Sequence, residues 1–246
     1  MNSLIETGKI RPQKGFFSQN DSGRKGVSYK MCFLGIEDLQ NILDLQDLIA
    51  KNLQVAEIFR LHEEDYFRNL FCLERATLGV LTGQGLIAYS IIRIPGYGEE
   101  NLGKDIGLPQ EELGKVAHLQ ATVVHPLFRG NGLQRKMAKA HLRVIEDLGL
   151  PHVCCTVSPK NPVSLANIFS SGFVIKGLRP KFQGWCRYIM YKNILDNRNL
   201  DRSKVCEEIQ IIDSDIKGQA NLLKTGFVGF KMDRRPEGFR ISYAKP

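Results

Sequence analysis

The chain has 246 residues, of which 43% are hydrophobic and 24% charged, values ordinary for one large globular domain or one domain with an appendage. It contains no run of 18 apolar residues and no signal-like apolar core at the N-terminus, which predicts a cytoplasmic protein without a membrane segment. The six cysteines show no CxxC spacing, so we expect buried thiols and no metal site.

The formal net charge of +8 is unevenly distributed along the chain. Residues 36–65 carry eight acids, whereas residues 129–143 carry five bases and no acid. A basic helix can bind a phosphate group or nucleic acid, although a solvated helix face explains most of these side chains equally well. Nucleic-acid binding is the minor alternative, because the sequence has neither zinc-finger spacing nor a helix-turn-helix signature.

The first half of the chain predicts a sheet with helices packed on it. Polar residues 1–27 are expected to form a loosely ordered leader. Three strands are expected, at residues 29–34, 74–82 and 86–94. Two helices are expected, at residues 37–52 and 62–71. Residues 95–114 are dense in glycine, proline and acids, and we interpret them as a surface loop that either covers an acceptor site or is simply exposed.

A strand, a turn and a helix are predicted over residues 116–148. Small and apolar residues at 116–124 indicate a buried strand, which Pro126 ends. Gly130 and Gly132 can take the left-handed conformations that a tight turn requires. The apolar face of the following helix consists of Leu133, Met137, Ala140, Val144 and Leu148. The first N–H groups of such a helix favour an anion, above all a phosphate.

Two common phosphate loops do not fit this turn. The pattern GxxxxGK[ST] is absent, and a dinucleotide-binding GxGxxG would need a glycine at Arg135. The sequence R-G-N-G-L-Q at residues 129–134, preceded by V-H-P, resembles the acyl-CoA pyrophosphate loop of the GNAT superfamily of acetyl-CoA-dependent N-acetyltransferases, Q/R-x-x-G-x-G/A. Arg129 and Gly132 occupy the first two fixed positions, and Gln134 replaces the usual glycine or alanine.

A second segment supports the resemblance. Residues 152–157 predict a buried strand, and N-P-V-S-L-A-N-I-F-S-S-G-F at residues 161–173 predicts a helix that Asn161 caps and Gly172 ends. In the superfamily an asparagine follows the corresponding strand, and a Gly-Phe pair closes the helix. Strands at residues 173–178 and 185–192 would complete the sheet.

The resemblance covers residues 28–195 and implies an α/β (α+β) fold of GNAT type: a mixed, mostly antiparallel central sheet flanked by helices, with splayed central strands. It implies acetyl-CoA as the co-substrate and no metal. The implied cofactor-binding residues are Thr122, Val123, Val124, Arg129, Gly130, Asn131, Gly132, Leu133, Gln134 and Asn161. For Asn161, an ordinary role as the helix N-cap is an equal explanation.

The implied reaction moves the acetyl group to a primary amine of a small molecule or peptide, by direct attack through a tetrahedral intermediate. Strand alternation puts His118 on one face with Gln120 and Thr122, and His118 resembles a proton-relay histidine of members that acetylate arylalkylamines. His118 is therefore the candidate base, with a packed, hydrogen-bonded histidine as the alternative. No acid is assigned. The leaving CoA thiolate takes its proton either from water or from Tyr188, Tyr191 or Cys155.

Ile168 stands where many relatives carry the acidic tyrosine, and together with Gln134 it suggests an alternative function: a non-catalytic acyl-CoA-binding or sensor protein of the same fold. Residues 196–246 predict a small C-terminal α/β extension, with a strand at 205–212, a helix at 215–224 and a hairpin at 227–243. The extension could pair with the sheet edge, shape the acceptor pocket or mediate a homodimer.

Overall fold

The computed structural model describes residues 13–18, 26–53, 55–196 and 207–246. The chain divides into two compact units. Unit 1 comprises residues 1–93 and 119–149, and unit 2 comprises residues 94–118 and 150–246. Within the part of the chain that the structure describes, no helix has the length and apolar character that crossing a membrane would require.

Within the residues that the structure describes, the sheet of unit 1 contains five strands. In spatial order they are β1 (Gln13–Ser18), β2 (Gly26–Phe33), β3 (Thr77–Thr82), β4 (Gly85–Arg93) and the C-terminal part of β5 (Val116–Val124). The pairs β1/β2, β2/β3 and β3/β4 are antiparallel. Gly85, with φ of +100°, begins β4 directly after the turn at residues 83–84 and pairs with Thr82, so the glycine-containing hairpin predicted there is confirmed.

Residues 13–18 correct the expectation of a loosely ordered leader. They form β1, which pairs with β2 from Gln13 opposite Met31 to Ser18 opposite Gly26. The leader composition predicted no strand, but β2 supplies backbone partners along the whole length of β1, and paired backbone groups stabilise an otherwise unremarkable sequence. The remaining residues of the predicted leader, 1–12 and 19–25, lie outside the described residues.

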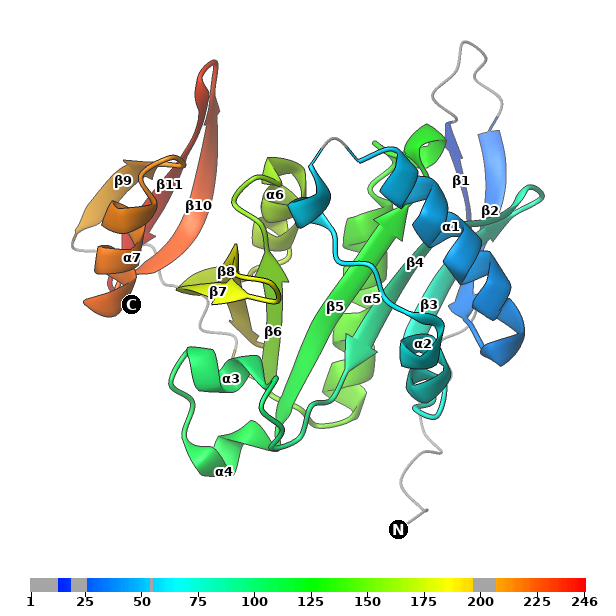
Figure 1. Cartoon of the computed structure of the whole chain (residues 1–246), viewed down its shortest axis with the longest axis horizontal. Helices are drawn as coiled ribbons and strands as arrows, with labels where there is room; N and C mark the ends of the chain where they lie inside the picture. Colours follow the sequence, from blue (N-terminus) through cyan, green and yellow to red (C-terminus); the bar gives the residue numbers. More distant parts are fainter. Residues whose placement is uncertain (1–12, 19–25, 54, 197–206) are drawn as a thin grey trace. The chain divides into compact units, whose positions relative to one another are not determined.

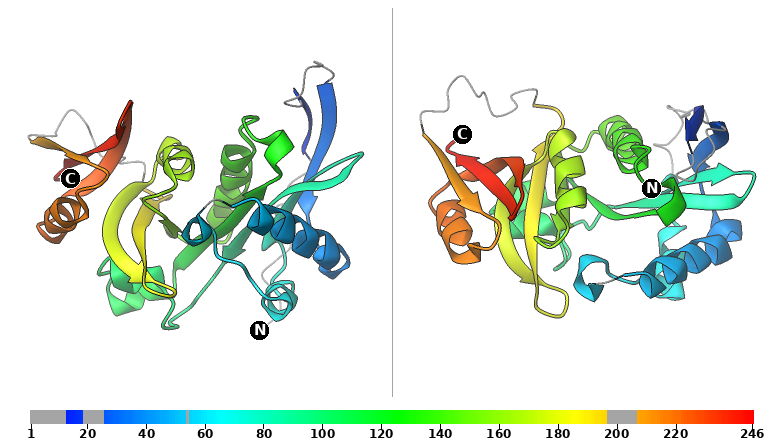
Figure 2. Two further views of the ribbon diagram at one scale, coloured as in Figure 1. Left: turned by 45° about the horizontal axis from the view of Figure 1, so that its top comes forward. Right: turned by 90° about the horizontal axis from the view of Figure 1, so that it is seen from above.

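Helices cover both faces of this sheet (Figures 1 and 2). One face carries α5 (Leu133–Asp147), and the other carries α1 (Leu39–Lys51) and α2 (Glu64–Leu70). The described part of the unit also contains three short 3-10 helices: η1 (Ile36–Asp38), η2 (Ala56–Ile58) and η3 (Pro126–Phe128). Leu133, Met137 and Ala140 of α5 are buried in one hydrophobic core with strand residues such as Leu78 and Ile87. Burial on both faces explains the nearly continuous apolar sequence of β3 to β5.

The sheet of unit 2 begins with the first residues of β5. The strands that follow in space are β6 (His152–Val157), β8 (Trp185–Asn193), β7 (Val174–Lys181), β10 (Val228–Arg235), β11 (Gly238–Ala244) and β9 (Glu208–Ile212). β5 and β6 are parallel, over residues 116–118 and 152–154, and the other pairs described in this unit are antiparallel. The predicted mixed, mostly antiparallel sheet flanked by helices is confirmed, and the splayed central strands remain a prediction.

The C-terminal extension continues this sheet, because β10 pairs with β7 at Gly229 opposite Ile175. Of the three roles that the sequence left open for the extension, pairing with the edge of the sheet is therefore confirmed. Among its described residues, unit 2 has four helices: α3 (Leu102–Asp105), α4 (Gln110–Leu113), α6 (Pro162–Ser170) and α7 (Ile216–Lys224).

Residues 95–114, interpreted from sequence as a surface loop, contain α3 and α4, and Leu102 packs into a hydrophobic core with Val116, Cys154 and Ile189 of the sheet. Leu102 and Leu113 are buried there, together with Asn101. The Asn101 amide donates to the carbonyl oxygens of Gly96 and Leu113, at 2.6 and 2.9 Å, and its Oδ1 accepts from Gly103 N–H at 2.8 Å. One buried side chain thus satisfies three backbone groups, which glycine and proline content could not predict.

Candidate functional site

The turn after β5 lies within unit 1 and is held by its own side chains. His125 Nδ1 accepts from Leu127 N–H at 3.2 Å, and Asn131 Nδ2 donates to the carbonyl of Phe128 at 3.1 Å. Phe128 is buried in the core beneath α5 and anchors the turn. Gly130 and Gly132 have φ of +83° and +69°, so the predicted left-handed conformations are confirmed at both glycines.

Helix α5 begins on this turn without a side-chain cap. Gly132 is its N-cap residue, and the helical bonding starts with Lys136 N–H donating to the Gly132 carbonyl at 3.0 Å. The Arg135 guanidinium lies alongside, since Nη2 would be 3.5 Å from a Cβ placed on Gly132. Buried Leu133 and Met137 hold the first turn in place. A rigid helix N-terminus beside a guanidinium and a bare glycine backbone is suited to bind an anion.

Most of the residues predicted to bind acetyl-CoA are brought together in this one strand–turn–helix segment. On β5, Thr122 is exposed, Val123 is buried and Val124 is half-buried. The carbonyl of Val124 accepts from Arg129 Nε at 3.3 Å, which folds the exposed Arg129 side chain back over the end of the strand. The loop residues 129–134 follow directly, and their binding of acetyl-CoA remains a prediction.

Asn161 belongs to unit 2, where it is the N-cap of α6. Its Oδ1 accepts from Ser164 N–H at 3.0 Å, so the capping role that the sequence predicted is confirmed. Gly172, with φ of +83°, ends the helix as expected. The contact of Asn161 with acetyl-CoA remains a prediction.

A polar cluster on the face of the sheet beneath α2 was not predicted. Tyr66 of α2 donates from its hydroxyl to Gln120 Oε1 on β5 at 2.7 Å, and its ring stacks on His62 with centroids 4.0 Å apart. Tyr89 on β4 is fully buried, and its hydroxyl has no hydrogen-bond partner within the described residues. Burial raises the pKa of Tyr89 well above its ordinary value, and the neighbouring Tyr66 phenol raises it further. Residues far apart in sequence meet here, so no local pattern could have indicated the cluster.

His118, the candidate base, lies in unit 2 and is buried. Its Nε2 accepts from the backbone N–H of Leu102 at 3.1 Å, at the start of α3. An imidazole nitrogen that accepts a hydrogen bond carries no proton. This contact therefore favours the neutral tautomer of His118 that is protonated on Nδ1. The base role of His118 remains a prediction.

Two of the three alternative acids, Tyr188 and Tyr191, make polar side-chain contacts, and the third, Cys155, is buried. Tyr188 donates to Gln219 Oε1 at 2.8 Å, and burial raises its pKa. Cys155 is 3% exposed, and burial raises its pKa. The Tyr191 hydroxyl lies 2.9 Å from His152 Nδ1, and burial raises the pKa of Tyr191 to about 12. At neutral pH all three groups hold their protons.

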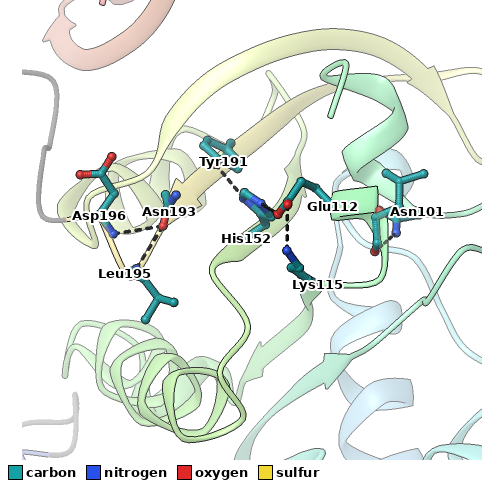
Figure 3. Close-up of polar contacts among 9 residues, drawn as sticks. Asn101, Glu112, Lys115, His152, Tyr191, Asn193, Leu195 and Asp196 are labelled. Carbon is teal, nitrogen blue, oxygen red and sulfur yellow. Dashed lines mark hydrogen bonds and ion pairs between the residues drawn. The ribbon is translucent and has the colours of Figure 1, made fainter. Parts of the chain in front are cut away.

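Figure 3 shows the chain of contacts around His152. His152 Nε2 lies 3.0 Å from Glu112 Oε2, and the other oxygen of Glu112 accepts from Lys115 Nζ at 2.8 Å. Glu112 belongs to α4, His152 to β6 and Tyr191 to β8. These contacts attach α4 to the sheet of unit 2.

Comparisons with known proteins support the fold. No protein-family model and no curated protein sequence matches the chain. A solved structure of yncA, a putative acetyltransferase from Salmonella typhimurium with its cofactor acetyl-CoA, matches with a TM-score of 0.53 at 18% identity, over 69% of this chain and 95% of that chain. Naa20 from Chaetomium thermophilum, in complex with a bisubstrate analogue, matches with a TM-score of 0.54 at 16% identity, over 70% and 89%.

A third structure, an acetyltransferase of the GNAT family from Listeria monocytogenes, matches with a TM-score of 0.51 at 18% identity, over 73% of this chain and all of that chain. The chain has the GNAT fold. At this level of identity the likeness establishes the fold, and the activity has to be argued from the residues.

Proposed function

We propose that this GNAT-fold protein is an acetyl-CoA-dependent N-acetyltransferase that acetylates a primary amine. The observation that carries the proposal is the turn between β5 and α5, where Gly130 and Gly132 are left-handed and α5 begins without a side-chain cap. The similarity to an acetyltransferase solved with acetyl-CoA and to an acetyltransferase of the GNAT family supports it.

In this proposal the pyrophosphate of acetyl-CoA lies on the first turn of α5, where backbone N–H groups and the Arg135 guanidinium donate to it. Each charge-assisted hydrogen bond contributes about 1.5–3 kcal/mol net, so a few of them hold a cofactor at micromolar strength after the costs of association. Backbone groups of Thr122 and Val124 bond the amides of the pantetheine arm. Arg129 then exchanges the Val124 carbonyl, its present partner, for the ligand.

The chemistry requires a neutral amine, removal of one proton as the C–N bond forms, and return of one proton to the CoA thiolate as the C–S bond breaks. His118 is the proposed base, and it must release the Leu102 N–H before Nε2 can accept a proton. Tyr66, whose hydroxyl donates to Gln120, is the proposed acid for the leaving thiolate. Ile168, at the position of the usual tyrosine, has no proton to give, so the proton for the thiolate comes from Tyr66 or from water.

The proposal is tested in two steps. Saturating acetyl-CoA, at about 100 times its dissociation constant, should raise the free energy of unfolding by about 2.7 kcal/mol, measured by urea denaturation. An unchanged midpoint at millimolar acetyl-CoA would rule out both an enzyme and a sensor. Thiol release is then followed over a panel of small amines and peptides.

The second step separates the enzyme from the non-catalytic alternative that Ile168 and Gln134 suggest. Release of free CoA that depends on the amine, with a matching mass increase of 42 Da (one acetyl group replacing one proton) on the acceptor, supports the enzyme. Tight acetyl-CoA binding without release on any acceptor supports the acyl-CoA sensor.

A further inference from the structure

The C-terminal extension repeats the sequence around α6 and β7. Three recurrences lie 54 positions apart without gaps: Ala166-Asn167 with Ala220-Asn221, Gly172-Phe173-Val174 with Gly226-Phe227-Val228, and Gly184 with Gly238. The helix caps Asn161 and Asp215 have the same separation. We call residues 152–193, which form β6, α6, β7 and β8, the first arm, and residues 208–244, which form β9, α7, β10 and β11, the second arm.

The two arms share their local geometry. Asn161 Oδ1 accepts from Ser164 N–H at 3.0 Å, and Asp215 Oδ1 accepts from Gly218 N–H at 2.8 Å. Both helices have nine residues and end at a left-handed glycine, with φ of +83° at Gly172 and +89° at Gly226. α6 and α7 are therefore capped alike, by an acceptor side chain at the N-terminus and by a left-handed glycine at the C-terminus.

The arms also share their strand pairing. β6 pairs antiparallel with β8, and β9 pairs antiparallel with β11. The hairpin β7/β8 has its irregularity between Ile175 and Gly177, and the hairpin β10/β11 has its irregularity between Gly229 and Lys231, again 54 positions later. A bulge is a specific feature of a fold, so its recurrence at the equivalent position indicates a duplicated unit rather than two similar hairpins.

The arms meet around an internal two-fold axis. β7 and β10 are equivalent strands, and they pair antiparallel at Ile175 and Gly229, which are equivalent positions. α6 contacts β10, and α7 contacts β7. Such reciprocal contacts are the mark of an isologous interface between two copies. Gly229 makes this approach feasible, because a Cβ there would lie only 3.0 Å from Cδ1 of Ile175.

We propose that the second arm takes, within one chain, the place of the same arm of a second copy, and so closes the β7 edge against pairing with another molecule. With β10 on β7, the sheet ends instead at β9, a strand of five residues whose exposed side chains are Glu208, Gln210 and Ile212. Because β9 is short and carries a charged and a polar residue among its exposed side chains, it is a poorer template for further pairing than a long apolar edge. The partner that this surface fits is thus a second copy of the chain, and the second arm excludes it.

A buried polar cluster joins the arms. Gln219 of α7 has no exposed surface, and it replaces the apolar Leu165 found at the equivalent position of α6. Its Oε1 accepts from Tyr188 of the first arm at 2.8 Å and from Tyr243 of the second at 2.9 Å. Its Nε2 donates to the carbonyl oxygens of Ile212 and Asp213. Both tyrosines are satisfied together only while the arms are docked, which ties the second arm to this position.

A disulfide between the arms tests the proposal in the full-length chain. Opposed residues on antiparallel strands have Cα separations within the range that a disulfide bridges, so Ile175→Cys combined with Gly229→Cys should crosslink. We expect a disulfide within one chain, located by peptide mass mapping and seen as a monomer on a non-reducing gel. Ile175→Cys alone and Gly229→Cys alone are the controls for the native cysteines. A disulfide between two chains, or none in folded protein, would overturn the proposal.

Hydrogen exchange on the unaltered chain decides the question if the double variant does not fold. Amides of residues 174–181 should be protected to the same degree at nanomolar and high micromolar protein, because their partner strand belongs to the same molecule. Protection that disappears on dilution would show that the partner comes from a second copy.

Discussion

Two glycines at opposite ends of α5 offer a matched test of the acetyl-CoA loop. Gly132 precedes the helix with φ of +69°, and Gly149 follows it with φ of +67°. Alanine at either position has to adopt a left-handed conformation, which costs about 1–2 kcal/mol. Gly132→Ala and Gly149→Ala should therefore lose similar free energy of unfolding, and each should melt about 2–8 °C lower than the parent chain.

Sterics do not separate the two variants. A Cβ on Gly149 would meet no atom within 4 Å, and a Cβ on Gly132 would meet only the Arg135 guanidinium, at 3.5 Å. Both variants are expected to fold, so a difference in acetyl-CoA affinity between them reports on the site itself.

Acetyl-CoA binding should separate the variants. The methyl group of Gly132→Ala lies beside Arg135 and strains the first turn of α5, where the pyrophosphate is proposed to bind. The loss of one charge-assisted hydrogen bond, about 1.5–3 kcal/mol, raises the dissociation constant for acetyl-CoA by about tenfold to 150-fold. Gly149→Ala should bind as the parent does. Titration calorimetry measures both, and equal affinities for the two variants would refute the loop assignment.

Three further predictions concern single side chains. His118→Ala should lower kcat with little change in acetyl-CoA affinity, and an unaltered pH–rate profile would argue against its role as base. Tyr66→Phe keeps the ring on His62 but removes the hydroxyl, so kcat should fall by about 100-fold or more at unchanged affinity; undiminished kcat would exclude Tyr66 as the acid. Burial lowers the pKa of His141 from 6.5 to about 4. Between these two pH values His141 is protonated in the unfolded chain and neutral in the folded one. The free energy of unfolding should therefore fall by up to about 1.4 kcal/mol per pH unit as the pH drops from about 6.5 to 4. In urea titrations over this pH range, the free energy of unfolding of His141→Leu should fall less steeply with pH than that of the parent chain. An equal pH dependence in the two proteins would contradict a lowered pKa of His141.

Local features were readable from the sequence by itself. The helical period from Leu133 onward and the two glycines before it predicted the β5–α5 turn, because helix periodicity and left-handed backbone depend on residues only a few positions apart. The N-cap at Asn161 and the end of α6 at Gly172 were predictable for the same reason. These local signals, matched to a family pattern, were sufficient to anticipate the fold.

Contacts between distant residues were decided only by the tertiary structure. β1 exists because β2 supplies its backbone partners, and the Tyr66–Gln120 bond joins a helix to a strand 54 residues further on. The bond from Leu102 to His118 likewise depends on how residues 95–114 fold. The duplicated Gly-Phe-Val was present in the sequence, but its meaning came from the pairing of Ile175 with Gly229, since only the folded chain shows that equivalent strands meet.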